Sequence, residues 1–103
     1  MSVLEVARVV VDPAQSQEFE AAFDEAIALV RTAEGHRGSR LARDLEKPGA
    51  YLFLVTWDDL SDHVDKFVGS AAFGEFESLI GPFLLEAPEV IHVEGNDAKE
   101  GGR

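Results

Sequence analysis

The histidines are the side chains of this sequence best suited to proton transfer at neutral pH. There are three of them, His36, His63 and His92. An imidazole titrates close to neutral pH, so it can act as a general base toward a substrate hydroxyl within about 3 Å. His63 follows shortly after Trp57, the only tryptophan, whose indole N–H can donate a hydrogen bond to a ligand oxygen. The sequence therefore indicates His63 and Trp57 as candidate catalytic residues.

Each of these residues also has a purely structural interpretation. His63 lies among three aspartates and could simply cap a helix or bridge charges at the surface. Trp57 could anchor the core or its rim without lining a pocket. We expect His92 to be a hydrogen-bonded histidine within a strand, and His36, which follows a glycine, to lie exposed in a loop.

Two arginines are candidates for binding an anion. Arg40 and Arg43 occupy different faces of one predicted strand, so one of them is expected to point toward a buried side. A buried guanidinium needs a partner, which can be a carboxylate such as Asp44 or Glu5, or an anionic ligand. We take Arg40 as the candidate site residue and keep a structural ion pair as the alternative.

The sequence carries no recognisable motif for a metal or a cofactor. It has no cysteine, which excludes disulfides, thiolate catalysis and Cys-ligated metal sites. The three histidines show neither His-x-x-x-His nor His-x-Asp spacing, and no glycine-rich phosphate loop is present. We therefore predict that no metal and no cofactor takes part.

Length and charge limit the possible partners. The 103 residues suffice for one small domain, which we place at 1–95, followed by a disordered tail at 96–103. The net charge of −11 repels phosphate backbones and anionic lipid, so we expect neither a nucleic acid nor a membrane as partner. No apolar run approaches the ~18 residues of a membrane span. Together with the lack of cysteine and of a signal peptide, this fits a cytoplasmic protein.

Hydrophobic periodicity predicts the elements that must position these residues. Alternating, β-branched segments predict strands at 2–11, 38–45, 50–57 and 88–94. Apolar residues at helical spacing predict a helix over about 14–33, begun by Asp12 and Pro13. A short helix is predicted at 59–68. Ser70 is expected to cap the next helix, which Pro82 kinks or ends.

This order, β-α-β-β-α-β, is that of a ferredoxin-like α+β fold with a four-stranded antiparallel sheet. A single layer of helices can cover only one face of such a sheet. Because the strands are apolar on both faces, the second face also needs a cover, and a second copy of the chain is the simplest one. We therefore predict a homodimer in which two sheets pack together as a dimeric α+β barrel.

Several segments together resemble the antibiotic biosynthesis monooxygenase (ABM) domain family of the dimeric α+β barrel superfamily. They are the hairpin GSRLARDLEKPGAYLFLVTW with Trp57 at its end, His63, the segment FVGSAAFGEFESLIGPFL and the closing strand PEVIHVE, within residues 3–94. The resemblance implies a small pocket in each subunit between the helices and the sheet. Members of the family include oxygenases that act on quinols and polyketide aromatics without metal or flavin, and others that degrade haem.

The haem-degrading branch fits this sequence poorly. Its members carry an Asn in the first strand, and here that strand reads SVLEVARVV. Their iron-ligating His lies on the last helix, where this chain has Phe76 and Glu77. His63 lies earlier, on the preceding short helix. Haem cleavage is therefore disfavoured.

The leading hypothesis is a cofactor-independent monooxygenase acting on a small aromatic phenol or quinol. His63 would be the base or proton relay, Trp57 a positioning donor and Arg40 or Arg43 an anion stabiliser. The predicted substrate-binding residues are Phe23, Phe53, Phe67, Phe73 and Phe76. The alternative is a non-catalytic, ligand-binding dimer. A His63 open to a cavity shared with Trp57 favours the enzyme, and a His63 facing bulk water favours the alternative.

Overall fold

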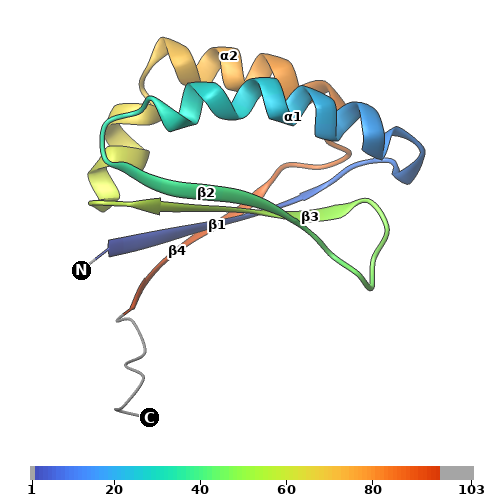
Figure 1. The fold of residues 1–103 in the computed structure, drawn as a ribbon, viewed down its shortest axis with the longest axis horizontal. Coiled ribbons are helices and arrows are strands. Elements are labelled where there is room, and N and C mark those ends of the chain that lie inside the picture. Colours follow the sequence, from blue (N-terminus) through green and yellow to red (C-terminus); the bar gives the residue numbers. More distant parts are fainter. Residues whose placement is uncertain (1, 96–103) are drawn as a thin grey trace.

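A four-stranded antiparallel sheet with a layer of helices on one face makes up residues 2–95, the part of the chain that this computed structural model describes (Figure 1). The elements are β1 (Ser2–Val10), η1 (Pro13–Gln15), α1 (Ser16–Arg31), β2 (His36–Arg43), β3 (Ala50–Trp57), η2 (Asp62–Phe67), α2 (Ala71–Ile80), η3 (Gly81–Phe83) and β4 (Glu89–Gly95). The strand order is β2-β3-β1-β4. The predicted ferredoxin-like α+β fold is confirmed, and the tail predicted at 96–103 lies outside the described residues.

The start of the first helix follows the predicted local chemistry. Pro13 occupies the first position of the 3-10 turn η1, and Asp12 Oδ1 accepts a hydrogen bond from the Ala14 N–H at 2.9 Å. The α-helix proper begins three residues later and buries an apolar stripe against the sheet. Its buried residues are Phe19, Phe23, Ala26, Ile27 and Val30.

Strand β2 begins and ends two residues earlier than predicted. It runs from His36 to Arg43 instead of 38–45. The early end is explained by the side chain of Asp44, whose Oδ1 accepts the backbone N–H of Glu46 at 2.8 Å and that of Lys47 at 3.2 Å. This local capture of two N–H groups starts the turn toward β3 early.

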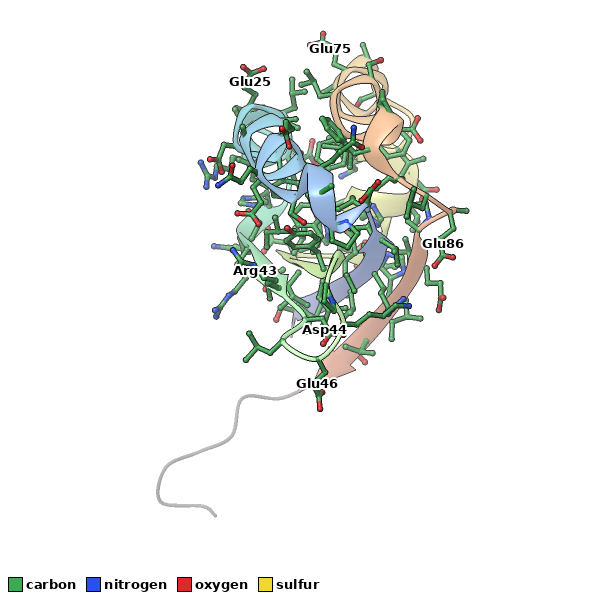
Figure 2. The ribbon with its side chains drawn as sticks, turned by 90° about the vertical axis from the view of Figure 1, so that its right-hand side faces the viewer. Glu25, Arg43, Asp44, Glu46, Glu75 and Glu86 are labelled. Atoms are coloured by element: carbon green, nitrogen blue, oxygen red, sulfur yellow. The ribbon has the colours of Figure 1, made fainter. Side chains whose placement is uncertain are left out.

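The core lies between the helices and one face of the sheet. Alternate residues of β3, from Tyr51 to Trp57, point toward α1 and α2 and are buried. The outer sides of the two helices carry charge instead, as Glu25 on α1 and Glu75 on α2 illustrate (Figure 2). No helix within residues 2–95 is long and apolar enough to cross a membrane.

The opposite face of the sheet is called here the open face, because none of the helices within residues 2–95 lies over it (Figure 1). Its apolar side chains come from the three strands β1, β3 and β4. They include Leu4, Val6, Leu52, Leu54, Ile91 and Val93. Ile91 is 58% exposed and Val93 43% exposed, both on the edge strand β4. The sheet is therefore apolar on both faces, as the alternation in the sequence predicts.

Candidate functional site

A cavity of about 290 Å³ lies between the helical layer and the sheet. Its wall is mainly apolar and is contributed by β1, β3, β4, both main helices, η2 and η3. All of the phenylalanines predicted to bind a substrate line it: Phe23, Phe53, Phe67, Phe73 and Phe76. The structure thus brings these five residues together around one space, and their role toward a substrate stays a prediction.

The size and the aromatic wall of this cavity suit a small aromatic molecule. A cavity of about 150 Å³ can hold benzene, so one of 290 Å³ has room for a ligand of about one or two rings. Phe53 and Phe76 are stacked with ring centroids 5.8 Å apart, and Phe67 meets Phe73 edge-on at 5.6 Å. Aromatic walls in these orientations offer both ring faces and ring edges to a ligand.

His63 belongs to the wall of this cavity together with Trp57. The imidazole is only 7% exposed, and it stacks on the indole with centroids 5.3 Å apart and an interplanar angle of 22°. The interpretation of His63 as a surface histidine is therefore wrong. Helix η2 turns His63 and Asp62 inward, whereas Asp59 and Asp65 remain exposed.

Glu5 is a residue of the site that was not predicted from the sequence. Glu5 lies on the helix-facing side of β1 and is 5% exposed. The Trp57 Nε1–H donates a hydrogen bond to Glu5 Oε1 at 2.9 Å, and the same oxygen lies 3.4 Å from His63 Nε2. The sequence did carry a signal, because Glu5 is the one carboxylate on a strand face otherwise made of valine and alanine. The contact also means that the indole N–H, expected to bind a ligand, is engaged by Glu5.

His92 extends this group of polar side chains to the edge of the sheet. His63 Nδ1 and His92 Nε2 are 2.8 Å apart, a hydrogen-bond distance. His92 is the register partner of Glu5 between β4 and β1, so both side chains emerge on the helix-facing side at the same level. The prediction that His92 is a hydrogen-bonded histidine within a strand is confirmed.

Burial shifts the pKa values of the buried groups. Removal from water disfavours a charged imidazole, which lowers the pKa of His63 to about 4, and the nearby His92 lowers it as well. Burial raises the pKa of Glu5, and the hydrogen bond from Trp57 partly opposes this. At neutral pH His63 is therefore uncharged and able to accept a proton.

The placement of His63 depends on an unusual turn of helix. Segment η2 is π-helical, and the Val68 N–H donates to the His63 carbonyl at 3.0 Å. Such segments are rare and occur frequently at functional sites. Gly35 supports η2 from outside: its φ is +83°, and a Cβ at this position would overlap the carboxylate of Asp62. Gly35 thus allows the residue beside His63 to pack closely.

The two candidate arginines lie away from the cavity. Arg40 is exposed and is the register partner of Leu54 on the open face. Arg43 is also exposed and contacts Glu20, with Nη2 and Oε2 3.3 Å apart. The expectation that one of them is buried is wrong within this chain, because β2 is an edge strand whose long side chains reach solvent.

The structure also corrects the position of His36. This residue begins β2 and is half-buried, with Nε2 3.1 Å from Ser39 Oγ, so the prediction of an exposed loop residue is wrong.

Within residues 2–95 no group of three or more histidines and carboxylates is arranged to hold a metal ion.

Comparison with known proteins identifies relatives of this chain. Residues 2–78 match a family model described as antibiotic biosynthesis monooxygenase. The uncharacterised Bacillus subtilis protein YczJ is 33% identical over 92 residues, which are 89% of this chain and 97% of YczJ.

Solved structures show the same fold. A Bordetella bronchiseptica protein named for the same family superposes with a TM-score of 0.88 at 33% identity, covering 92% of this chain and 97% of that one. SnoaB from Streptomyces nogalater, described as a cofactor-independent oxygenase, superposes with a TM-score of 0.79 at 20% identity. The superposition covers 96% of this chain and 97% of the SnoaB chain. Because the identity is only 20%, the likeness to SnoaB shows the fold alone.

Proposed function

Because this chain belongs to the antibiotic biosynthesis monooxygenase family, we propose that it is a cofactor-independent monooxygenase acting on a small aromatic phenol or quinol. The observation that carries this proposal is the position of His63. The imidazole is buried and opens on the same aromatic cavity as Trp57, instead of facing bulk water. A binding module needs an apolar cavity, but it does not need a proton acceptor in the wall of that cavity.

In this reaction the substrate itself supplies the electrons. A neutral His63 takes the proton of a ring hydroxyl and leaves an electron-rich anion, which reacts with O₂. Overall the substrate loses two hydrogens and gains one oxygen atom, and the second oxygen atom leaves as water. The imidazolium formed at His63 lies 3.4 Å from Glu5 Oε1, so a carboxylate there stabilises the charge. Trp57 contributes by holding Glu5 and by forming the wall.

The charge of the cavity wall favours a neutral ligand. Among residues 2–95, the acidic residues that line the cavity are Glu5 and Glu77, and no Lys or Arg of this part of the chain contributes to the wall. Glu77 is exposed on α2, so it stands where the cavity meets solvent. An aromatic molecule that already carries a negative charge is repelled there, whereas a protonated phenol or quinol can enter.

We also propose that the protein works as a homodimer formed through the open face. Leu52 and Leu54 lie in the middle of this face, and Ile91 and Val93 on its edge strand are 58% and 43% exposed. Apolar side chains gathered on one uncovered face of a sheet are typical of a protein interface. A second copy offers an identical surface and covers it with two-fold symmetry.

The test of the enzymatic proposal is oxygen uptake. Purified protein is mixed with a panel of hydroquinones and anthrones, and with carboxylated analogues, in an oxygen electrode. We expect uptake with the neutral compounds, weaker uptake with the carboxylated ones, and a loss of about 10²-fold or more in kcat for His63→Gln. Arg37→Gln, which changes an exposed residue outside the cavity, serves as the matched control.

One observation favours a second function, the binding of a small aromatic ligand without catalysis. A His63 with a pKa near 4 is a weak base toward a phenol. Tight binding of neutral aromatics without oxygen uptake by the wild-type protein would contradict the enzymatic proposal and favour this one. Adding haemin in the same experiment tests the haem branch, for which we expect no shift of the Soret band.

A further inference from the structure

We propose that a proton relay begins at His63 and ends at His92, which releases the proton to solvent. Glu5 positions the His63 ring and stabilises its charged form. The inference deepens the proposed function, because it says where the proton taken from the substrate goes. It rests on one arrangement of four side chains. Trp57, Glu5, His63 and His92 form a continuous series in which the contacts measure 2.9, 3.4 and 2.8 Å.

The hydrogen bonds in this series have a defined direction. An indole nitrogen can only donate, so Glu5 Oε1 accepts from Trp57. Of the two imidazole nitrogens of His63, Nδ1 lies 2.8 Å from His92, whereas Nε2 lies 3.4 Å from the nearest carboxylate oxygen. Nε2 is therefore the nitrogen left for a substrate. It is a base only if the proton of the neutral ring sits on Nδ1 and is donated to His92 Nε2.

With the proton on Nδ1, His63 can take a proton on one side and pass another on at the other side. When the substrate hydroxyl gives its proton to His63 Nε2, the ring holds two protons and becomes an imidazolium. The Nδ1 proton can then pass along the 2.8 Å hydrogen bond to His92 Nε2. His92 in turn releases the proton of its own Nδ1 to solvent. One proton enters at His63 and one leaves at His92, and both rings are left with their protons on Nε2. When the second oxygen atom leaves as water, it takes up a proton that returns from solvent along the same path, and this return restores the protons to the Nδ1 atoms.

His92 is the most exposed of the four side chains in this series. His63 and Glu5 are 7% and 5% exposed, and Trp57 is fully buried. His92 is half-buried and lies on β4, an edge strand of the sheet. No hydrogen bond among residues 2–95 involves its second ring nitrogen, Nδ1. His92 is thus the member of the series that connects the buried site with water.

The charged groups around His63 fit this direction of transfer. Glu5 from β1 lies on the Nε2 side of the ring and His92 from β4 on the Nδ1 side. The remaining acidic residue of the cavity wall, Glu77, is exposed on α2. A carboxylate at Glu5 stabilises the transient imidazolium, and a low proton affinity of the buried His63 favours passing the proton on.

The first experiment needs no substrate and uses the whole chain labelled with ¹⁵N. Nuclear magnetic resonance identifies the tautomer of His63, for which we expect a proton on Nδ1 and a ¹⁵N–¹⁵N coupling to His92 Nε2. A proton on Nε2 instead, or no coupling between the rings, would overturn the relay.

The second measurement is the exchange of the His63 Nδ1 proton with water. His92→Gln places an amide oxygen where it can still accept the hydrogen bond, but this side chain cannot pass a proton on. A positioned acid–base group accelerates a proton transfer by about 10²-fold or more. We therefore expect the exchange in His92→Gln to slow by at least about tenfold. Exchange that is unchanged or faster would contradict the proposal. Arg37→Gln again serves as the control.

Turnover separates this inference from the proposed function. If the wild-type protein consumes oxygen, His92→Gln should lower kcat at an unchanged KM, and added imidazole should restore part of the rate. An unchanged kcat would overturn the relay while leaving the monooxygenase proposal intact. If the wild-type protein consumes no oxygen, the proposed function fails, and the exchange measurement still decides whether the two histidines pass protons.

Discussion

Replacing Gly35 with alanine tests whether this glycine holds His63 in place. Gly35 has a φ of +83°, and an added Cβ would overlap the carboxylate of Asp62, the residue before His63. The Gly35 carbonyl also accepts the Asp58 N–H at 2.8 Å, so the loop cannot move freely away from η2. The substitution therefore strains the backbone and pushes on the first turn of the π-helical segment at the same time.

The expected destabilisation can be added up from these two effects. A non-glycine residue in the left-handed region costs about 1–2 kcal/mol. Moving the buried Asp62 disturbs its contact with Lys66 Nζ at 3.1 Å, which adds about 1–2 kcal/mol. The sum is about 2–4 kcal/mol, which corresponds to a fall in Tm of about 8–16 °C at about 4 °C per kcal/mol for a domain of this size.

Gly38→Ala is the matched control for this experiment. Gly38 lies three residues later, within β2, has an ordinary φ, and a Cβ there would meet nothing within 4 Å. Its replacement should change the free energy of unfolding by less than about 0.5 kcal/mol. Urea unfolding measures both variants, and the fluorescence of Trp57, which stacks on His63, reports on the site. Equal stability of the two variants would refute the reasoning.

Two further predictions concern His63 and the open face. The pKa of His63 falls from 6.5 to about 4 on folding, so its contribution is fully present above pH 6.5 and is lost as the pH drops toward 4. Between pH 7 and pH 4 the wild-type protein should lose on the order of 3 kcal/mol more than His63→Gln, as measured by urea unfolding, and equal losses would contradict this. For the dimer, Ile91→Glu places a charge on the 58% exposed Ile91 of the open face and should give a monomer in analytical ultracentrifugation at micromolar concentration, whereas Glu25→Gln, on the outer side of α1, should sediment as the wild type. A wild-type protein that sediments as a monomer would rule out the proposed interface.

The elements could be predicted from the sequence because periodicity reports which side of an element is apolar. The run from Ala50 to Trp57 alternates cleanly and forms β3 within the predicted bounds. The cap by Ser70 was also predictable, since it depends on a side chain and a backbone N–H three residues away, and Ser70 Oγ does accept the Phe73 N–H. The early end of β2 was less visible because it depends on the rotamer that Asp44 adopts.

The sequence by itself determined which residue types and which apolar faces this protein has, including an aromatic interior and a sheet that is apolar on both sides. Only the tertiary structure decided which polar groups meet. Glu5, His63 and His92 are far apart in the chain, and they converge because the β1–β4 register pairs Glu5 with His92 while η2 brings His63 over them. Alternation likewise placed Arg40 on one side of a strand without revealing that this side is the open face. Periodicity sets the direction of a side chain relative to its own backbone, whereas its neighbours depend on strand order and register.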